Sequence, residues 1–143
     1  MLEQPAYRSI ADKVLFEPAA RLNDDGELIA QLASPELEEM RRHIGVFKIG
    51  GRSAYRKYLD ARRRDPLSSY WDDFVKKAGL DPDRVKTAAR SEETQAALKT
   101  ASQTATDLGL QGDLYILVEN RELADVRDKD DFIRLLNAVY GKN

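Results

Sequence analysis

The chain has 143 residues, enough for one ordinary domain, and its 23 basic and 25 acidic residues give a formal net charge of −2. This near balance disfavours a general polyanion binder, and strongly apolar runs such as Tyr115–Val118 are far shorter than the roughly 20 residues of a membrane-spanning helix. The chain has no cysteine and a single histidine, His43, which excludes disulfides, thiolate catalysis and multi-histidine metal centres.

Two short extended segments are predicted before the first helix. Lys13–Phe16 favours a strand that ends before Pro18, and Glu27–Leu32 favours a second extended segment. The intervening Asn23–Gly26 has the composition of a turn. Met1–Arg8 has no basic stretch followed by an apolar stretch, so no signal peptide is expected.

A cluster of four helices is predicted over about residues 34–90. Ser34-Pro35 is typical of a helix start, and Gly50-Gly51 separates the first two helices. Ser68 or Ser69 is expected to cap the third helix, which Gly79 ends. The predicted helices are Pro35–Lys48, Arg52–Arg64, a segment carrying Trp71 to Ala78, and Pro82–Ala89.

The last third is predicted to change character. Ser91 opens a long helix that Gly109 ends, and its expected apolar face holds Ala97, Leu98, Ala101, Ala105 and Leu108. A mostly apolar strand over Leu114–Glu119 then turns at Asn120-Arg121 into an antiparallel strand. The second strand is expected over Glu122–Val126, and a closing helix over Asp128–Tyr140.

This C-terminal succession resembles the second half of a thioredoxin fold. A long helix ending in Leu108-Gly109-Leu110 is followed by Gln-Gly-x-x-Tyr-Ile-Leu-Val-Glu-Asn, a hairpin and a final helix. The helix-rich segment of about 34–90 resembles the insertion of the DsbA-like branch. The resemblance implies an α/β fold, in which a thioredoxin-like sheet carries an insertion of about four helices within a single domain of residues 1–143. Since little chain precedes Lys13, the sheet is expected to be incomplete or degenerate.

The chain departs from this family at both of its hallmarks. Redox members carry Cys-x-x-Cys at a helix start, and this chain has no cysteine. The resemblance places the family's cis-proline at Leu114, where a cis bond would cost about 2.5–4 kcal/mol, so a trans bond is expected. No catalytic residue and no cofactor is expected in this chain.

The resemblance implies a redox-inactive domain that binds protein or an extended peptide. The family's substrate-facing loop corresponds here to Gly112, Asp113, Leu114 and Tyr115. An alternative is a fragment, or a cysteine-free form, of a DsbA-like thiol–disulfide oxidoreductase. The family implies a location in the periplasm or cell envelope, and an open sheet edge would allow a homodimer.

A weaker alternative, an anion or nucleic-acid adaptor, comes from charge. Residues 41–64 hold nine basic residues and one acidic residue, a net charge of +8. The same pattern is typical of a solvated helix face whose basic residues pair with Glu36, Glu38, Glu39 and other nearby acids. The slightly acidic chain also disfavours nucleic acid. The candidate anion-binding residues are Arg41, Arg42, Arg52, Arg56, Arg62, Arg63 and Arg64.

Other conspicuous residues are predicted to be structural. His43 lies beside the apolar positions of its helix and is expected to be a half-buried structural residue. Gly50–Ser53 is interpreted as a helix break in preference to an anion site. Asp72-Asp73 and the acids of 128–131 are interpreted as helix-start residues, and no metal site is expected. Helical spacing favours a core role for the aromatic residues Tyr58, Tyr70, Trp71 and Phe74.

Overall fold

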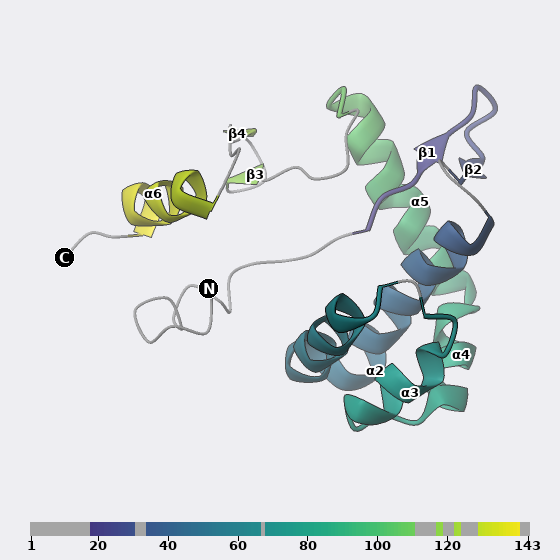
Figure 1. Ribbon diagram of the computed structural model, residues 1–143. Coiled ribbons are helices and arrows are strands. Elements are labelled where there is room, and N and C mark those ends of the chain that lie inside the picture. The colour runs from purple at the N-terminus through teal and green to yellow at the C-terminus, as the bar shows by residue number, and fades with distance from the viewer. Residues whose placement is uncertain are drawn as a thin grey trace. The chain divides into compact units, whose positions relative to one another are not determined.

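The computed structural model describes residues 18–30, 34–66, 68–110, 117–118, 122–123 and 129–140. The chain divides into two compact units (Figure 1). One spans Phe16–Gly109 and is called the helical unit here, and the second contains Leu110–Asn143 together with Met1–Leu15. The described residues are mostly helical, with two small antiparallel strand pairs, so helices and strands coexist as expected but helix dominates.

The helical unit begins with a short hairpin. Strand β1 (Arg21–Leu22) pairs with β2 (Leu28–Ile29) in the register Arg21 to Ile29 and Leu22 to Leu28. The predicted turn is confirmed, because Gly26 N–H donates to the Asn23 carbonyl at 2.9 Å and the Asn23 side-chain oxygen accepts from Glu27 N–H at 2.8 Å.

The first strand of this hairpin was not predicted. The expected strand at Lys13–Phe16 lies outside the described residues, whereas β1 lies beyond Pro18. It packs against α5 (Glu92–Asp107), where the buried Ser102 hydroxyl accepts a hydrogen bond from Ala20 N–H at 2.8 Å. Strand β1 has only two residues and no strong strand pattern in its sequence, and it is held by its contact with α5.

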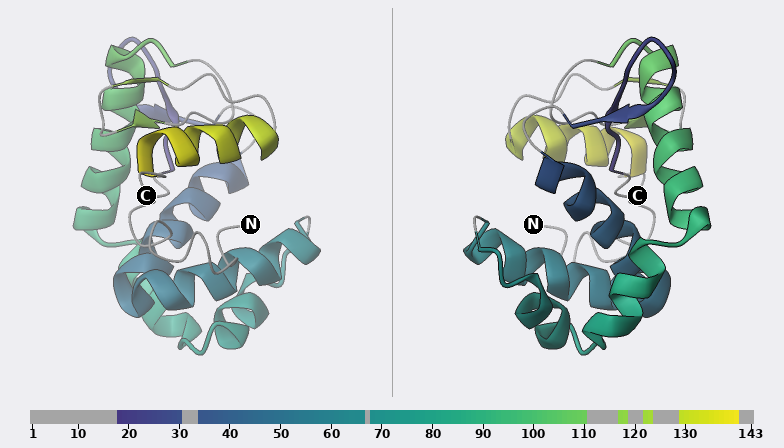
Figure 2. Two further views of the ribbon diagram at one scale, coloured as in Figure 1. Left: turned by 90° about the vertical axis from the view of Figure 1, so that its left-hand side faces the viewer. Right: turned by 90° about the vertical axis from the view of Figure 1, so that its right-hand side faces the viewer.

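Helix α2 (Ser34–Arg64) contains the first two predicted helices joined end to end. Gly51 has φ 64° and ψ −168°, a region open to glycine and strained for other residues, and it separates a first half (34–50) from a second half (52–64). Figure 2 shows the two halves running in different directions. The predicted break at Gly50-Gly51 is confirmed, and Gly51 is the residue that makes it.

The next helix starts follow local capping rules with one exception. Asp81 caps α4 (Pro82–Ala89) by accepting from Asp83 N–H at 2.9 Å, and Ser91 caps α5 by accepting from Thr94 N–H at 3.3 Å. The predicted cap at Ser68 or Ser69 is wrong. Helix α3 (Trp71–Lys77) has Tyr70 as its N-cap without a side-chain cap, because Ser68 Oγ accepts from Tyr70 N–H in the turn ahead of the helix.

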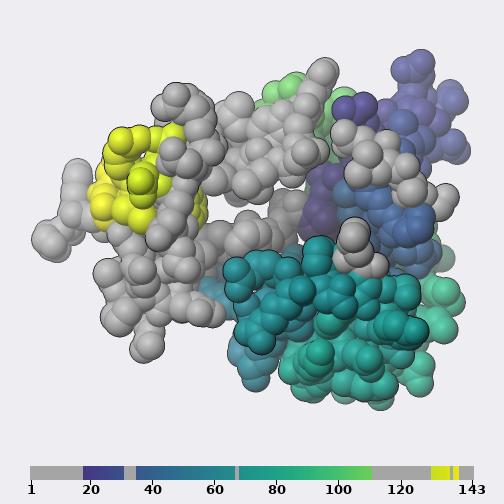
Figure 3. Space-filling model, viewed as in Figure 1, coloured from purple at the N-terminus to yellow at the C-terminus, as the bar shows by residue number. Residues whose placement is uncertain are grey.

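The core of the helical unit lies where α2 packs against α3 and α4. In the space-filling view of Figure 3, the side chains of this part of the chain form one closely packed body. At Gly45 the helices approach so closely that an added Cβ would lie 2.9 Å from the Val85 carbonyl oxygen and 3.0 Å from Ala89 N. The buried cluster comprises Val46, Tyr55, Tyr58, Phe74, Val75, Ala78 and Val85.

The predicted buried face of α5 needs correction. Leu98 is fully buried, but Leu108 is 50 % exposed and Ala97 is exposed. The other buried positions are Thr94 and Ser102, whose hydroxyls donate to the carbonyls of Ala88 and Leu98 at 2.7 Å each. Small hydroxyl residues can be buried here because both find internal acceptors.

In the second unit, β3 (Leu117–Val118) pairs antiparallel with β4 (Glu122–Leu123), in the register Leu117 to Leu123 and Val118 to Glu122. Helix α6 (Lys129–Tyr140) follows. The predicted hairpin and closing helix are therefore confirmed, while the outer parts of the predicted strands lie outside the described residues. Among the described helices, none is long and apolar enough to cross a membrane.

Candidate functional site

A cluster of ionisable side chains surrounds Glu39, and we call it the Glu39 cluster. Glu39 Oε1 accepts from the Tyr58 hydroxyl at 2.8 Å and from Arg62 Nε at 3.0 Å, while Arg42 pairs with Oε2. His43 Nε2 lies 3.3 Å from Oε1, and His43 Nδ1 lies 2.9 Å from the Tyr55 hydroxyl. The cluster comprises Glu39, Arg42, His43, Tyr55, Tyr58 and Arg62.

The Glu39 cluster joins the two halves of α2. Glu39 and His43 come from the first half, and their partners Tyr55, Tyr58 and Arg62 come from the second. The His43 ring also meets the rings of Tyr55 and Tyr58 edge to face, with centroids 5.7 and 5.5 Å apart. The bend at Gly51 brings these residues together, and the cluster holds the bend in place.

Burial and charge shift the pKa values within the Glu39 cluster. Burial raises the pKa of Glu39, but hydrogen bonds from His43 and Tyr58 and the charge of Arg42 outweigh it and lower the pKa to about 2. Burial and the Glu39 charge raise the pKa of Tyr55 to about 12, and burial and Glu39 also raise the pKa of Tyr58. Glu39 is therefore a carboxylate, and both phenols stay protonated, at neutral pH.

The Glu39 cluster is chemically closed. Its carboxylate already has four partners, and the Glu39 side chain is only 22 % exposed. A general base needs an open approach for the proton that it takes, which this arrangement does not leave. The cluster therefore acts as a structural connection. His43 is half-buried, as expected from its place beside the apolar positions.

The sequence indicated Glu39 as one of the acids that pair with the basic segment, which is confirmed, but not as the centre of a cluster. The spacing of Glu39 to Arg42 and His43 is the i, i+3 and i, i+4 spacing of helical neighbours, and this signal was available. Tyr58 and Arg62 lie 19 and 23 residues further along the chain. Their contacts with Glu39 depend on the bend at Gly51, and no pattern of neighbouring residues in the sequence predicts them.

Many of the candidate anion-binding arginines pair with carboxylates of the helical unit. Arg41 lies 3.5 Å from Glu38, and Arg42 and Arg62 pair with Glu39. Arg63 and Arg64 both pair with Asp60, at 3.0 and 2.8 Å, and lower the pKa of its carboxyl. Arg52 and Arg56 also have interaction partners, and both are half-buried in the second half of α2. The segment therefore presents less free positive charge than its composition suggests.

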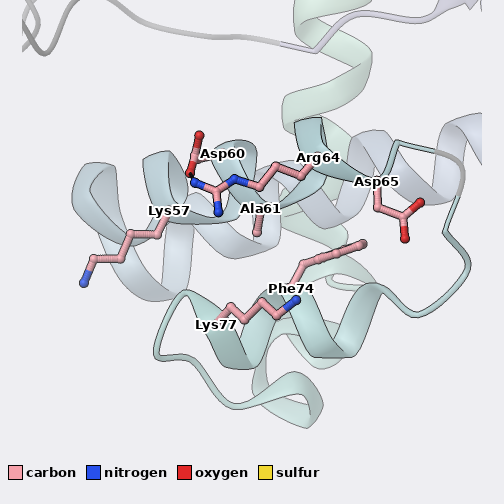
Figure 4. Close-up of a pocket in the computed structure, with 7 residues that line it drawn as sticks. All are labelled: Lys57, Asp60, Ala61, Arg64, Asp65, Phe74 and Lys77. Carbon is pink, nitrogen blue, oxygen red and sulfur yellow. Dashed lines mark hydrogen bonds and ion pairs between the residues drawn. The ribbon is translucent and has the colours of Figure 1, made fainter.

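A cavity of about 370 Å³ lies between the second half of α2 and α3 (Figure 4), and we call it the charged hollow. Its volume is near the lower limit of the roughly 300–1,000 Å³ that is typical of small-molecule sites. Phe74 is 4 % exposed and Ala61 is half-buried, so the floor is apolar. The charged lining residues are Lys57, Asp60, Arg64, Asp65 and Lys77.

Two cationic side chains lie near the aromatic ring of the floor. Lys77 Nζ lies 5.5 Å from the centroid of the Phe74 ring, and the Arg62 guanidinium lies 5.4 Å from the same centroid. Arg62 thus links the charged hollow to the Glu39 cluster. A second hollow between α2 and α4 has no aromatic side chain in its lining, which comprises Lys48, Ile49, Asp83, Arg84, Thr87, Ala88 and Ser91.

The predicted peptide-binding loop, the predicted core aromatic residues and the expected absence of a metal site are compared with the structure next. The expected binding residues Gly112, Asp113, Leu114 and Tyr115, and with them the trans bond expected at Leu114, lie outside the described residues. Tyr70 is 71 % exposed, so its expected core role is wrong, because it precedes α3 and points away from the packed face. Trp71 is partly buried beneath the Arg42 guanidinium, at 4.4 Å. Within the ranges that the structure describes, no acidic or histidine cluster could hold a metal ion.

No protein-family model, no curated protein and no solved structure gives a significant match to this chain. The function is therefore argued from the geometry of the described residues.

Proposed function

We propose that this chain is a redox-inactive, thioredoxin-like domain that binds protein or an extended peptide, and that the charged hollow is a contact site. Redox inactivity follows from the sequence, because a chain without cysteine cannot carry out dithiol–disulfide exchange. Binding is proposed from the geometry of the helical unit.

Element order supports the thioredoxin-like part of this proposal. A helical cluster is followed by the long helix α5, the hairpin of β3 and β4 and the closing helix α6. A thioredoxin-like domain with a helical insertion requires the same succession. The described strands pair only two by two, so the element order carries this argument and sheet topology does not.

The observation that carries the binding proposal is the charged hollow itself. Phe74 and Ala61 form an apolar floor, while Lys57, Arg64 and Lys77 are exposed at the rim. An apolar floor with a charged rim is the usual anatomy of a protein contact, in which an apolar side chain enters and polar groups set the register. The Glu39 cluster offers no comparable opening.

The adaptor alternative has weaker support. Binding to a polyanion needs several unpaired cations along one face, because affinity arises from phosphate neutralisation and counterion release. Arg42, Arg62, Arg63 and Arg64 are already paired with carboxylates of the helical unit. A peptide that inserts one apolar side chain into the charged hollow does not require several unpaired cations.

An amide NMR titration with extended, partly unfolded peptides tests the proposal. We expect shifts that cluster at residues 57–65 and 74–77 and that persist in moderate salt. Ala61→Leu should fill the floor and abolish these shifts, whereas Ala96→Leu, at an exposed position of α5, should leave them unchanged. Shifts confined to Gly112–Tyr115 would support peptide binding but reject the charged hollow. No shifts at all would reject the function.

A further inference from the structure

We infer that the charged hollow selects an acidic peptide segment, in which a carboxylate precedes or follows an apolar side chain that enters the floor. This inference deepens the proposed function and depends on it. It is argued from the charges that remain at the rim once internal pairing is taken into account.

The acid in the middle of the rim is already neutralised. The two carboxylate oxygens of Asp60 bind Arg63 at 3.0 Å and Arg64 at 2.8 Å, so one carboxylate faces two guanidinium groups. These three side chains carry a combined charge of +1. An incoming partner therefore meets no net negative charge at the centre of α2's exposed face.

Two lysines of the rim remain without an acidic partner in the described part of the chain. Lys57 and Lys77 are exposed, and neither forms an ion pair there. The neighbouring Lys76 differs, because its Nζ lies 3.8 Å from Asp73. Lys77 is instead placed over Phe74, so a carboxylate that approaches Lys77 lies directly beside the apolar floor.

The hollow also has a direction. Figure 4 shows Lys57 and Asp65 at opposite ends, with Lys77 and Phe74 between them. Lys57 lies in α2 and Asp65 directly follows its last residue, Arg64, so the two positions are eight steps apart, a helical rise of about 12 Å. Asp65 is exposed and would repel a second carboxylate at its end. The chemistry therefore fits a segment with acidic residues at the Lys57 end, an apolar side chain over Phe74 and a neutral or basic residue near Asp65.

The experiment uses three fluorescein-labelled peptides that share a central leucine and differ in the two residues on one side of it: glutamates, glutamines or lysines. Fluorescence anisotropy with the full chain is measured at about 0.05 M and 0.3 M salt, since screening weakens exposed pairs. We expect the acidic peptide to bind about three- to ten-fold more tightly than the glutamine peptide at low salt, with the gap closing at high salt.

Charge reversal provides the decisive variant. Lys57→Glu combined with Lys77→Glu should invert the order, so that the lysine peptide binds more tightly than the acidic one. Lys99→Glu, on the exposed face of α5, should leave the order unchanged. Circular dichroism verifies that each variant is folded. We expect folding to be retained because both lysines are exposed.

The failures are distinguishable. If the acidic and glutamine peptides bind equally well and Ala61→Leu abolishes both, the acidic selectivity is rejected while peptide binding at the charged hollow stands. If the peptides bind but Ala61→Leu has no effect on any of them, the charged hollow is rejected as the contact site together with this inference, while peptide binding stands. If no peptide binds, the proposed function is rejected as well.

Discussion

The Glu39 cluster lies within α2, and the charged hollow is lined by α2 and α3; both contain acidic, basic and aromatic side chains, but only the first is closed to an incoming group. In the Glu39 cluster every charge has a partner inside the helical unit, and the carboxylate is 22 % exposed. In the charged hollow, Lys57 and Lys77 stand at an open rim without an acidic partner in the described chain. Composition cannot distinguish the two, because the bend at Gly51 decides whether Arg62 and Tyr58 reach Glu39.

The largest expected effect comes from removing the centre of the Glu39 cluster. Glu39→Ala removes the carboxylate that Arg42, Arg62 and the Tyr58 hydroxyl share. The other members of the cluster would then be partly buried without a compensating negative charge. We therefore expect the free energy of unfolding to fall by about 3–4 kcal/mol. Chemical denaturation followed by circular dichroism measures this.

Glu38→Ala is the matched control for that variant. Glu38 is one position away and 52 % exposed, and it pairs with Arg41 at 3.5 Å. We expect a loss below about 1 kcal/mol. Equal losses for the two variants would contradict the distinction between a closed cluster and a surface pair.

Acid should weaken the Glu39 cluster next. The folded pKa of Glu39 is about 2 against an ordinary 4.5, so its stabilisation is fully present above about pH 5 and is lost as pH falls toward 2. This difference corresponds to about 3 kcal/mol at most. Denaturation curves between pH 6 and about pH 2 should show the loss in the unaltered chain, and Glu39→Gln should flatten it. A slope that survives in Glu39→Gln would assign the acid sensitivity to other carboxyls.

A single hydroxyl should have a smaller effect. Tyr58→Phe keeps the buried ring but removes the donor that lies 2.8 Å from Glu39 Oε1. Hydrogen bonds to charged groups contribute about 1.5–3 kcal/mol, so we expect a loss near the lower end of that range. Tyr70→Phe, at a ring that is 71 % exposed, should change stability by less than about 0.5 kcal/mol. Thermal melts of the two variants give the comparison directly.

The smallest expected effect on stability lies in the charged hollow. Lys57→Gln and Lys77→Gln remove exposed charges without described acidic partners, so each should change the free energy of unfolding by less than about 0.5 kcal/mol. Denaturation curves that overlay the unaltered chain would agree with rim residues kept for binding. A loss comparable to that of Tyr58→Phe would instead make these lysines part of the packed structure.

Helix boundaries could be predicted because their signals are local. Asp81-Pro82, Ser91 and Gly109 act on backbone groups a few residues away, and the structure begins or ends helices at each. The failed cap at Ser68 has a local cause too, since Ser68 hydrogen-bonds the turn ahead of α3. Such competition among neighbouring hydroxyls is not visible from residue type alone.

The candidate site could be predicted only in part. The basic segment 41–64 and the structural His43 were recognised in the sequence, but Glu39, the acceptor that neutralises Arg42 and Arg62, was not recognised as their centre. Phe74 was expected in the core, and it is also the floor of the charged hollow. Both omissions concern contacts between residues far apart in the chain.

By itself, the sequence determined that this chain has no thiol chemistry, where its helices break, and that a hairpin and a helix close it. Capping, glycine conformation and composition act locally, so they can be judged without a fold. Only the tertiary structure decided which face of α5 is buried, where β1 pairs and which arginines are neutralised. Those outcomes depend on the angle at which packed helices meet, and a bend at one residue, Gly51, changes every long-range distance beyond it.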